Sequence, residues 1–365
     1  MSNDANPINY LIVGYGWRAP FFLKPAQAFP ETFRVTGIVA RNAEKGAAAT
    51  EKWGVPTWRT LEEALEAEQP DFVIASVSWD ASPEYVRACV ERGVPVLCET
   101  PPAPNQEELV RLWNDVGDSG LVQVAEQYPL YPGHQARRAV IDSGAIGEVN
   151  EAEVSSTHMY HAMAIIRQML DVGHEGATIR AIASTHKLAT PLTHAGWTDN
   201  ANPEPAKTVR ALISFEGGKV ATYDFTDNQW WNPLRQDRIA LRGELGEIVD
   251  LRVTQLKGER TFVTSHLERR QLGIELNLEG HDLDHISWNA EVVYGNRWKG
   301  ARFADDEVAV SELLRRMGDW VRGDGPPPYP LAEGSQDWAL ALAVEKSAET
   351  GEIVTMPRQP WAGAE

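Results

Sequence analysis

The chain has little cysteine, no long apolar run and no apolar leader. Its two cysteines, Cys89 and Cys98, are too few for a disulfide framework. No apolar run reaches the roughly 18 residues that a membrane-spanning helix needs. The polar start of the chain also lacks the basic and apolar regions of a signal peptide. We therefore expect a cytoplasmic protein without a membrane partner.

Basic charge is scarce as well. The chain has 34 lysine and arginine residues against 52 aspartate and glutamate residues, which gives a net charge of -18. Because nucleic-acid binding needs a basic surface, this balance argues against a nucleic-acid partner. A small anionic substrate stays possible, since a few local cationic side chains suffice to hold one.

The chain is long and rich in tryptophan. A chain of 365 residues exceeds one ordinary core and predicts two domains, and 43% hydrophobic with 24% charged residues is typical of a soluble globular protein. The chain has 13 tryptophans, most of which we expect in the core and at interfaces. Indole faces also stack on sugar rings, and we keep this interpretation for Trp230 and Trp231.

Short apolar strands alternate with helices in the first part of the chain. We expect strands at 9–13, 33–39, 71–77, 94–99 and 121–125, and helices at 19–28, 43–53, 61–68, 83–92 and 106–119. Continuous apolar strands are typical of parallel sheets that are buried on both faces. The alternation therefore predicts an α/β fold with a doubly wound parallel sheet over residues 1–126.

The pattern changes in residues 127–365. We expect helices at 135–143, 161–170, 307–322 and 336–350, a strand at 148–156, a hairpin at 208–215 and 219–225, and a strand pair at 238–242 and 247–251, with 296–306 irregular. These elements predict an α+β domain with an open, largely antiparallel sheet. We expect its last helix to pack back toward the first domain.

A glycine turn, GYGWRA at residues 14–19, directly follows the first strand and opens the first helix. Gly14 permits the tight turn, Gly16 lets a pyrophosphate approach the backbone, and Ala19 allows close packing of helix and strand. Backbone N–H groups and the helix dipole then stabilise the anion. In this context the turn predicts a Rossmann domain that binds a nicotinamide dinucleotide.

The position that reads the ribose carries no carboxylate. An NAD enzyme usually has Asp or Glu after the second strand, but this strand ends at Ala40 and Arg41. Arg41 could pair with a 2′-phosphate and admit NADP, stack on adenine, or lie on the surface. We expect NAD and do not exclude NADP.

Several segments in their order and spacing resemble the Gfo/Idh/MocA oxidoreductase family over nearly the whole chain. Besides the glycine turn, they are VIASVS at 73–78, GVPVLCETP at 93–101, SGAIGEV at 143–149, FEGG at 215–218, LRGELG at 241–246 and SAETG at 347–351. The resemblance implies a Rossmann domain, an open sheet domain used for assembly into homodimers or homotetramers, and hydride transfer at a carbohydrate-like carbinol. It places the cofactor-binding residues at Gly14, Tyr15, Gly16, Trp17, Arg18, Ala40, Arg41, Ser76, Ser78, Glu99, Thr100, Pro101 and Gln127.

The chain departs from the family at its catalytic residues. Family dehydrogenases have a Lys after the motif Glu, where this chain has Thr100, whose hydroxyl is not basic near neutral pH. The family signature Asp-x-Gly-x-His-x-x-Asp corresponds to residues 157–164. His161 matches its His, while Thr157 and Ala164 replace both Asp residues.

Two explanations remain for this loss. The chain has become a non-catalytic binding or regulatory protein, or it performs different chemistry on the same platform. We favour the second, because titratable side chains gather at the ends of two elements that meet in this fold. These candidate catalytic residues are Tyr128, Tyr131, His158, Tyr160 and His161. Each taken singly would more often be structural.

NAD-dependent glycosidases of the family also lack the Lys and use Tyr and His. The resemblance to this branch favours a redox-neutral cleavage, in which a sugar hydroxyl is oxidised, the aglycone is eliminated, water adds and the hydride returns. A simple sugar or polyol dehydrogenase remains the alternative. The expected partner is a small sugar or glycoside.

Substrate contacts are expected in the segment 227–235, which offers stacking faces in Trp230 and Trp231 and a fork donor in Arg235. Lys24, near the cofactor turn, is a further candidate. The alternative for the segment is a rim loop at a subunit interface. Residues 281–285 (HDLDH) resemble a metal cluster, but we interpret them as a turn within a loop and expect no metal.

Overall fold

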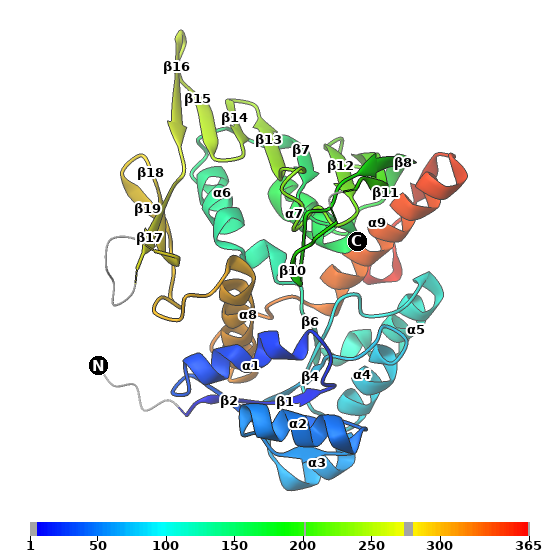
Figure 1. The fold of residues 1–365 in the computed structure, drawn as a ribbon. Helices are drawn as coiled ribbons and strands as arrows, with labels where there is room; N and C mark the ends of the chain where they lie inside the picture. The colour runs from blue at the N-terminus through cyan, green and yellow to red at the C-terminus, as the bar shows by residue number, and fades with distance from the viewer. Residues whose placement is uncertain (1–5, 201, 274–279, 364–365) are drawn as a thin grey trace. The chain divides into compact units, whose positions relative to one another are not determined.

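The computed structural model describes residues 6–200, 202–273 and 280–363. It divides into two compact units (Figure 1). Unit 1 comprises Met1–Tyr131, Gly273–Asp282 and Arg297–Ser335, and unit 2 comprises Pro132–Leu272, Leu283–Asn296 and Gln336–Glu365. The division after Tyr131 lies five residues beyond the expected boundary, and 297–335 falls with the first unit.

Unit 1 contains a six-stranded parallel sheet of order β3-β2-β1-β4-β5-β6. Its strands are β1 (Ile8–Val13), β2 (Phe33–Val39), β3 (Thr57–Trp58), β4 (Phe72–Ala75), β5 (Val96–Cys98) and β6 (Val122–Val124). This order is that of dinucleotide-binding sheets, in which ligands bind outside the carboxyl ends of the strands. The predicted doubly wound sheet is confirmed.

Helices of unit 1 begin and end at local sequence signals. They are α1 (Ala19–Ala28), α2 (Ala43–Trp53), α3 (Leu61–Ala67), α4 (Ser82–Glu91), α5 (Gln106–Val116) and α8 (Asp305–Val321). Asn42 caps α2, and Thr60 with Glu63 forms a capping box on α3. Helix α8 begins two residues before the predicted start, with acidic residues in the first turn, which the helix dipole favours.

Unit 2 is built on a nine-stranded sheet of order β16-β15-β14-β13-β7-β12-β11-β8-β20. Its strands are β7 (Val149–Ser155), β8 (Ala177–Leu188), β11 (Glu204–Phe215), β12 (Val220–Thr226), β13 (Arg238–Gly243), β14 (Gly246–Val249), β15 (Arg252–Gly258), β16 (Thr261–His266) and β20 (Val354–Met356). Strands β7 and β12 pair in parallel, and the other pairs are antiparallel. The largely antiparallel sheet was therefore predicted correctly.

Helices pack on one face of this sheet. They are α6 (Pro132–Asp142), α7 (Met159–Leu170) and the part of α9 (Leu331–Thr350) that belongs to unit 2. The Ser347 hydroxyl of α9 accepts a hydrogen bond from the Ala181 amide of β8 at 2.9 Å. Helix α9 starts five residues earlier than predicted, directly after Pro330, which ends the preceding loop.

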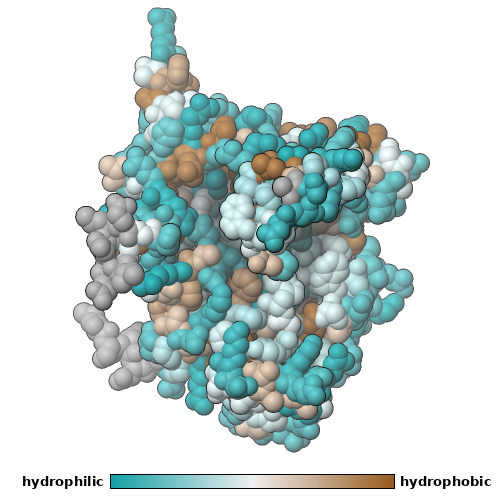
Figure 2. Space-filling model, in the orientation of Figure 1, coloured by the Kyte–Doolittle hydropathy of each residue, from teal (hydrophilic) through white to brown (hydrophobic). Residues whose placement is uncertain are grey.

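Several strands of unit 2 were not predicted. They include β8, β15 and β16, and the smaller pairings of β9 (Leu192–Thr193) with β10 (Gly196–Trp197) and of β17 (Glu268–Leu272), β18 (Asp282–Trp288) and β19 (Glu291–Gly295). The hairpin of β15 and β16 extends away from the rest of the sheet (Figure 1), and its residues Leu256 and Phe262 are exposed. Apolar surface is visible on this hairpin below its hydrophilic tip (Figure 2). In β15 one of the two buried positions is the polar Gln255, and β16 is largely exposed, so neither strand shows the apolar alternation of a half-buried strand.

The interpretation of residues 281–285 as a turn was wrong, because residues 282–285 lie in strand β18. Asp282 accepts hydrogen bonds from the backbone of Gly300 and, at 3.2 Å, of Arg302. In the described ranges no three His, Cys, Asp or Glu side chains are grouped to hold a metal ion. Nor does any helix there have the length and apolar content to span a membrane.

Candidate active site

The glycine turn joins β1 to α1 as predicted. Gly14 has a φ of 100°, and a Cβ at this residue would lie 2.0 Å from the carbonyl oxygen of Ser76, just after β4. At Gly16, by contrast, a Cβ would meet no atom within 4 Å. Gly14 is therefore required by the packing of the turn, whereas Gly16 keeps open the backbone approach that a pyrophosphate needs.

The three side chains around Gly16 take different directions. The Tyr15 hydroxyl accepts a hydrogen bond from Trp53 Nε1 at 3.0 Å. Trp17 is 79% exposed and packs edge-on against Phe21. Arg18 turns inward to Glu99, which follows β5. The Arg18 and Glu99 side chains thus already bind each other, and their contact with a cofactor remains a prediction.

Arg18 belongs to a polar cluster, the Asp306 cluster, made of Arg18, Glu99, Gln127, Tyr131 and Asp306. Arg18 Nε lies 2.9 Å from Glu99 Oε1, and Arg18 Nη1 lies 2.9 Å from Asp306 Oδ2. Gln127 Nε2 and the Tyr131 hydroxyl donate to Asp306 Oδ1 at 2.8 and 2.9 Å. Asp306, in the first turn of α8, thus fixes residues from α1, the end of β6 and the segment after it.

Protonation in this cluster follows from burial and charge. Burial alone would raise the pKa of Asp306, but Arg18 and the two hydrogen-bond donors lower it below its usual value. Burial outweighs Arg18 at Glu99, so its pKa is raised. Burial and Asp306 raise the pKa of Tyr131 well above its usual value. Tyr131 is therefore suited to donate a hydrogen bond rather than to act as a base.

Gln127 offers an acceptor for a cofactor amide. Its side chain is 3% exposed, and its Oε1 atom is buried without a hydrogen-bond partner among the residues that the structure describes. A buried acceptor without a donor is costly, and this one lies at the carboxyl end of β6, where such sheets bind dinucleotides. The carboxamide N–H of a nicotinamide would satisfy it. Gly16 and Gln127 thus both fit the predicted cofactor.

Glu126, between β6 and Gln127, was missed by the sequence analysis. It is 1% exposed, and its Oε1 accepts a hydrogen bond from the Tyr128 amide at 3.0 Å. Burial raises its pKa to about 8. Tyr128 in turn stacks on Tyr131, with ring centroids 4.5 Å apart. A lone Glu after an apolar strand gives no sequence signal of burial, which depends on the rest of the unit.

The raised pKa of Glu126 predicts an unusual pH dependence. Between its ordinary pKa of 4.5 and about 8, the folded chain keeps a proton that the unfolded chain has lost, so stability falls as pH rises across this window. We expect Glu126→Gln to stabilise the protein at pH 8 and to have little effect near pH 4.5. The test compares melting midpoints of the wild type and Glu126→Gln between pH 4.5 and pH 8. Glu66→Gln, at an exposed residue, is the control. A destabilised variant at pH 8 would contradict the expectation.

Two arginines lie at the ribose end of the sheet. Arg41 is exposed, directly after Ala40. Arg59, which the sequence analysis missed, follows β3 and donates to the carbonyl oxygens of Ala40 and, at 3.1 Å, of Asn42. The end of β2 is thus held by a guanidinium rather than by a carboxylate. The choice between NAD and NADP therefore stays a prediction to be tested.

Unit 2 brings the predicted His and Tyr residues together at the start of α7. His158 packs edge-on against Tyr160, His161 and Trp230, with centroid distances of 5.0, 5.2 and 4.7 Å. Trp230 also donates from Nε1 to the Thr157 hydroxyl at 3.1 Å. Burial, with a smaller contribution from His161, lowers the pKa of His158 to about 3. His158 is therefore a neutral imidazole at neutral pH.

Backbone geometry supports the match to the family signature at this helix. Met159 occupies the position of the signature Gly and has a φ of 47°, in the left-handed region that favours glycine. Its amide donates to the Tyr223 hydroxyl at 3.1 Å. The chain thus keeps the turn that places His161, although the glycine and both aspartates are lost.

A row of rings continues outward from this helix. Trp230 packs on Trp231 at 5.4 Å, and Trp231 on His194 of the β9–β10 hairpin at 5.7 Å. Asn228 and Asn232 donate to the carbonyl oxygens of Leu192 and Ala189 and tie this hairpin to the loop. We call His161, His158, Trp230, Trp231 and His194 the ring row. Trp230 and Trp231 are 38% and 41% exposed.

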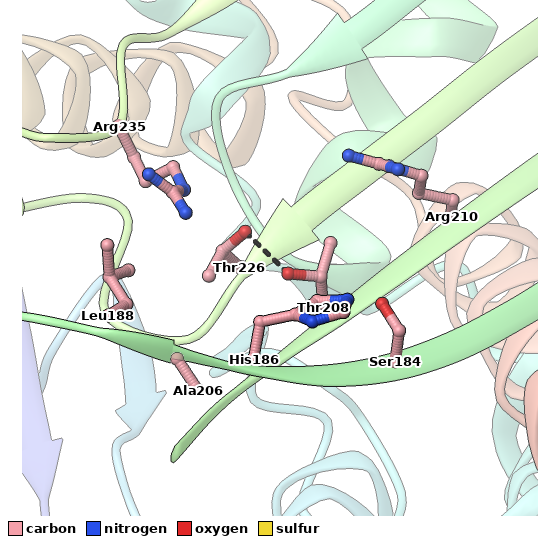
Figure 3. Close-up of a pocket in the computed structure, with 8 residues that line it drawn as sticks. All are labelled: Ser184, His186, Leu188, Ala206, Thr208, Arg210, Thr226 and Arg235. Atoms are coloured by element: carbon pink, nitrogen blue, oxygen red, sulfur yellow. Dashed lines mark hydrogen bonds between the residues drawn. The ribbon is translucent and has the colours of Figure 1, made fainter. Parts of the chain in front are cut away.

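Other predicted contacts are dispersed. Lys24 pairs with Glu307 of α8. Arg235 lines a hollow together with Thr226 (Figure 3). Phe225, the residue before Thr226, packs on His158 and Trp230. Because alternate residues of a strand point to opposite faces, Arg235 lies on the other face of β12 from the ring row. Ser78 is exposed after β4, and the Thr100 amide donates to Glu99. Pro101 is buried.

The sheet and the glycine turn of unit 1 match a known protein family. A family model described as "Oxidoreductase family, NAD-binding Rossmann fold", GFO_IDH_MocA, matches residues 8–126. Over these residues the chain is similar to the Gfo/Idh/MocA family. The match covers the sheet and the glycine turn of unit 1, so the predicted family and its NAD-binding Rossmann fold are confirmed there.

Curated relatives match over part of their length. Inositol 2-dehydrogenase from Corynebacterium glutamicum (strain R) is 27% identical over 118 residues, which are 32% of this chain and 35% of that protein. The enzyme of the same name from Pseudomonas fluorescens (strain SBW25) is 43% identical over 87 residues, 23% of this chain and 26% of that protein. The chain thus spans about a third or less of the length of these relatives.

Solved structures resemble the chain over nearly its full length. Levoglucosan dehydrogenase in complex with NADH and levoglucosan has a TM-score of 0.68 and 18% identity, over 96% of this chain and 100% of that one. The WlbA dehydrogenase from Bordetella pertussis, in complex with NADH and UDP-GlcNAcA, has a TM-score of 0.64 and 16% identity, over 97% of this chain and 99% of that one. At these identities the likeness shows the shared fold.

Proposed function

We propose that this chain is an NAD-dependent enzyme that takes a hydride from a ring carbinol of a sugar or glycoside. The ring row carries the proposal, because it starts at the family His and presents the partly exposed indoles of Trp230 and Trp231. Indole faces suit the C–H faces of sugar rings. The buried acceptor of Gln127 and the open turn at Gly16 support binding of NAD.

Bound NAD would supply a hydride acceptor that can also return the hydride. The chain's own residues must move the protons. Thr100 does not replace the family Lys as a base, and Tyr131 is held as a donor to Asp306. His161, packed against the neutral imidazole of His158, remains as the group that can take a proton from a sugar hydroxyl or from a carbon next to a ketone.

This pair of imidazoles favours redox-neutral glycoside cleavage as the finer form of the proposal. Oxidation of one carbinol acidifies the neighbouring C–H, a base removes that proton, and the aglycone leaves with a proton on its oxygen. Water then adds, and return of the hydride restores the hydroxyl, so no oxidant is consumed. Both a base and an acid are needed, and His161, beside the neutral imidazole of His158, can supply both in turn by taking the proton from carbon and then donating it to the aglycone oxygen. A simple sugar dehydrogenase needs only the first oxidation.

Chromogenic glycosides with catalytic NAD distinguish the two reactions. Cleavage releases many aglycones per NAD without net NADH, whereas equal amounts of product and NADH would exclude it in favour of dehydrogenation. We expect His161→Gln to lower kcat by about 100-fold or more if His161 acts as acid or base. Unchanged turnover in this variant would show that His161 is neither acid nor base. Absence of turnover in a wild-type chain that binds NAD would favour a non-catalytic cofactor-binding role.

A further inference from the structure

The open face of the unit 2 sheet has a polar hollow of about 130 Å³ between β8, β11 and β12 (Figure 3). It lies on the opposite face of β12 from the ring row, because Thr226 lines it while Phe225 contacts His158. Its polar lining residues are Ser184, His186, Thr208, Arg210, Thr226 and Arg235.

Strand register explains why these side chains meet. Thr208 pairs with Ser184 of β8 and with Thr226 of β12. Because alternate residues share a face, His186 and Arg210 project to the same side as this central row. Arg235 comes from the loop after β12. In Figure 3 the guanidinium groups of Arg210 and Arg235 flank the hydroxyls of Thr208 and Thr226 from two sides.

The two arginines have no carboxylate partner in the part of the chain that the structure describes. Arg235 donates to the carbonyl oxygen of Leu234, and Arg210 makes no ion pair there. Asp224 is opposite Arg210 in register, but its oxygens bind Ser155 and Arg238. Two other arginines of the same sheet do have acidic partners, Arg238 with Asp224 and Arg242 with Glu151.

The hydroxyls add donors without adding charge. Thr208 and Thr226 lie 2.8 Å apart, and whichever hydroxyl accepts keeps its own proton free to donate. Together with the two guanidinium groups and the Ser184 hydroxyl, these hydroxyls give the hollow more hydrogen-bond donors than the two oxygens of a carboxylate can accept in good geometry. A compact group with three terminal oxygens and up to two negative charges matches this set better.

We propose that this hollow binds the phosphate group of a small metabolite, or inorganic phosphate, at Arg210 and Arg235. The two arginines and the hydroxyls of Ser184 and Thr208 contact its oxygens. Since Arg235 ends the loop that carries Trp230 and Trp231, an occupied hollow would also restrain that loop. The site is independent of the proposed sugar chemistry, because its binding is measured without turnover.

Calorimetric titration of the full chain with inorganic phosphate, and separately with glycerol 3-phosphate, tests this site. Sodium chloride at matched ionic strength controls for screening. We expect saturable binding of one equivalent, weakened at least tenfold in Arg210→Ala and in Arg235→Ala and lost in the double variant. Arg180→Ala is the matched control, because Arg180 is an exposed arginine of β8 outside the hollow, and it should bind like the wild type.

Three results would overturn the proposal. They are absence of binding in the wild type, equal binding in the double variant, and equal weakening by Arg180→Ala. Sedimentation velocity of the same variants can give a fourth result that overturns the proposal. If the double variant changes the oligomeric state while wild-type binding is not saturable, the hollow holds an acidic group of a second copy instead. Tighter binding of glycerol 3-phosphate than of phosphate would identify a metabolite as the source.

Discussion

Gly14→Ala is expected to prevent unit 1 from folding normally, whereas Gly16→Ala leaves the fold intact and weakens NAD binding. At Gly14 an added Cβ would lie 2.0 Å from the Ser76 carbonyl oxygen, and the φ of 100° is strained for alanine. At Gly16 no atom lies within 4 Å of the added Cβ. That methyl group would instead occupy the space through which the pyrophosphate approaches the backbone.

Melting curves and NAD titration of the two variants separate these effects. We expect Gly14→Ala to lose most of its cooperative transition in unit 1, and Gly16→Ala to melt like the wild type while its Kd for NAD rises by more than about tenfold, or 1.4 kcal/mol. Exposed Gly173→Ala, whose added Cβ also has open space around it, is the control. Wild-type affinity in Gly16→Ala would show that the dinucleotide does not bind at this turn.

Asp306→Asn is expected to destabilise unit 1 by about 3 kcal/mol, the scale for breaking a largely buried ion pair. Asp306 binds Arg18, Gln127 and Tyr131, and its neutral replacement leaves Arg18 with Glu99 alone. The pKa of Asp306 is lowered in the folded chain. Its stabilisation is therefore present above its ordinary pKa of 3.8 and is lost as pH falls below that value.

Denaturation midpoints at pH 7 and below pH 3.8 measure this effect. The difference between wild type and Asp306→Asn should be large at pH 7 and shrink in acid. Exposed Asp324→Asn is the control and should match the wild type throughout. A difference that is the same at both pH values would mean that Asp306 acts through packing rather than charge.

The sequence predicted unit 1 well apart from the two-residue strand β3, because the other strands and the helices have local signals. Apolar strands led into Gly14, and caps such as Asn42 and Thr60 start helices. The ring row was partly predictable, since His158, His161, Trp230 and Trp231 were singled out. His194 was not, because its contact with Trp231 depends on the short β9–β10 hairpin, whose strands are too brief to show a periodic pattern.

The polar clusters were less predictable. Asp306 lies far along the chain from Arg18 and Gln127, and an acidic residue at a helix start has a sufficient local explanation. Arg210 and Arg235 meet at one hollow only through the register of β8, β11 and β12, and β8 itself was not predicted. Contacts between distant segments determine these sites, and periodicity in one sequence carries no information about them.

The most direct test of the proposed function is a single turnover of the enzyme with one equivalent of NAD and a panel of sugars and glycosides. Absorbance of the reduced nicotinamide is followed with substrates carrying hydrogen or deuterium at the ring carbinol. The account predicts that reduced nicotinamide forms, more slowly with deuterium, and that for a cleaved glycoside it disappears again as the aglycone is released. Aglycone release without any reduced nicotinamide, or no reduction with any sugar by enzyme that binds NAD, would contradict it.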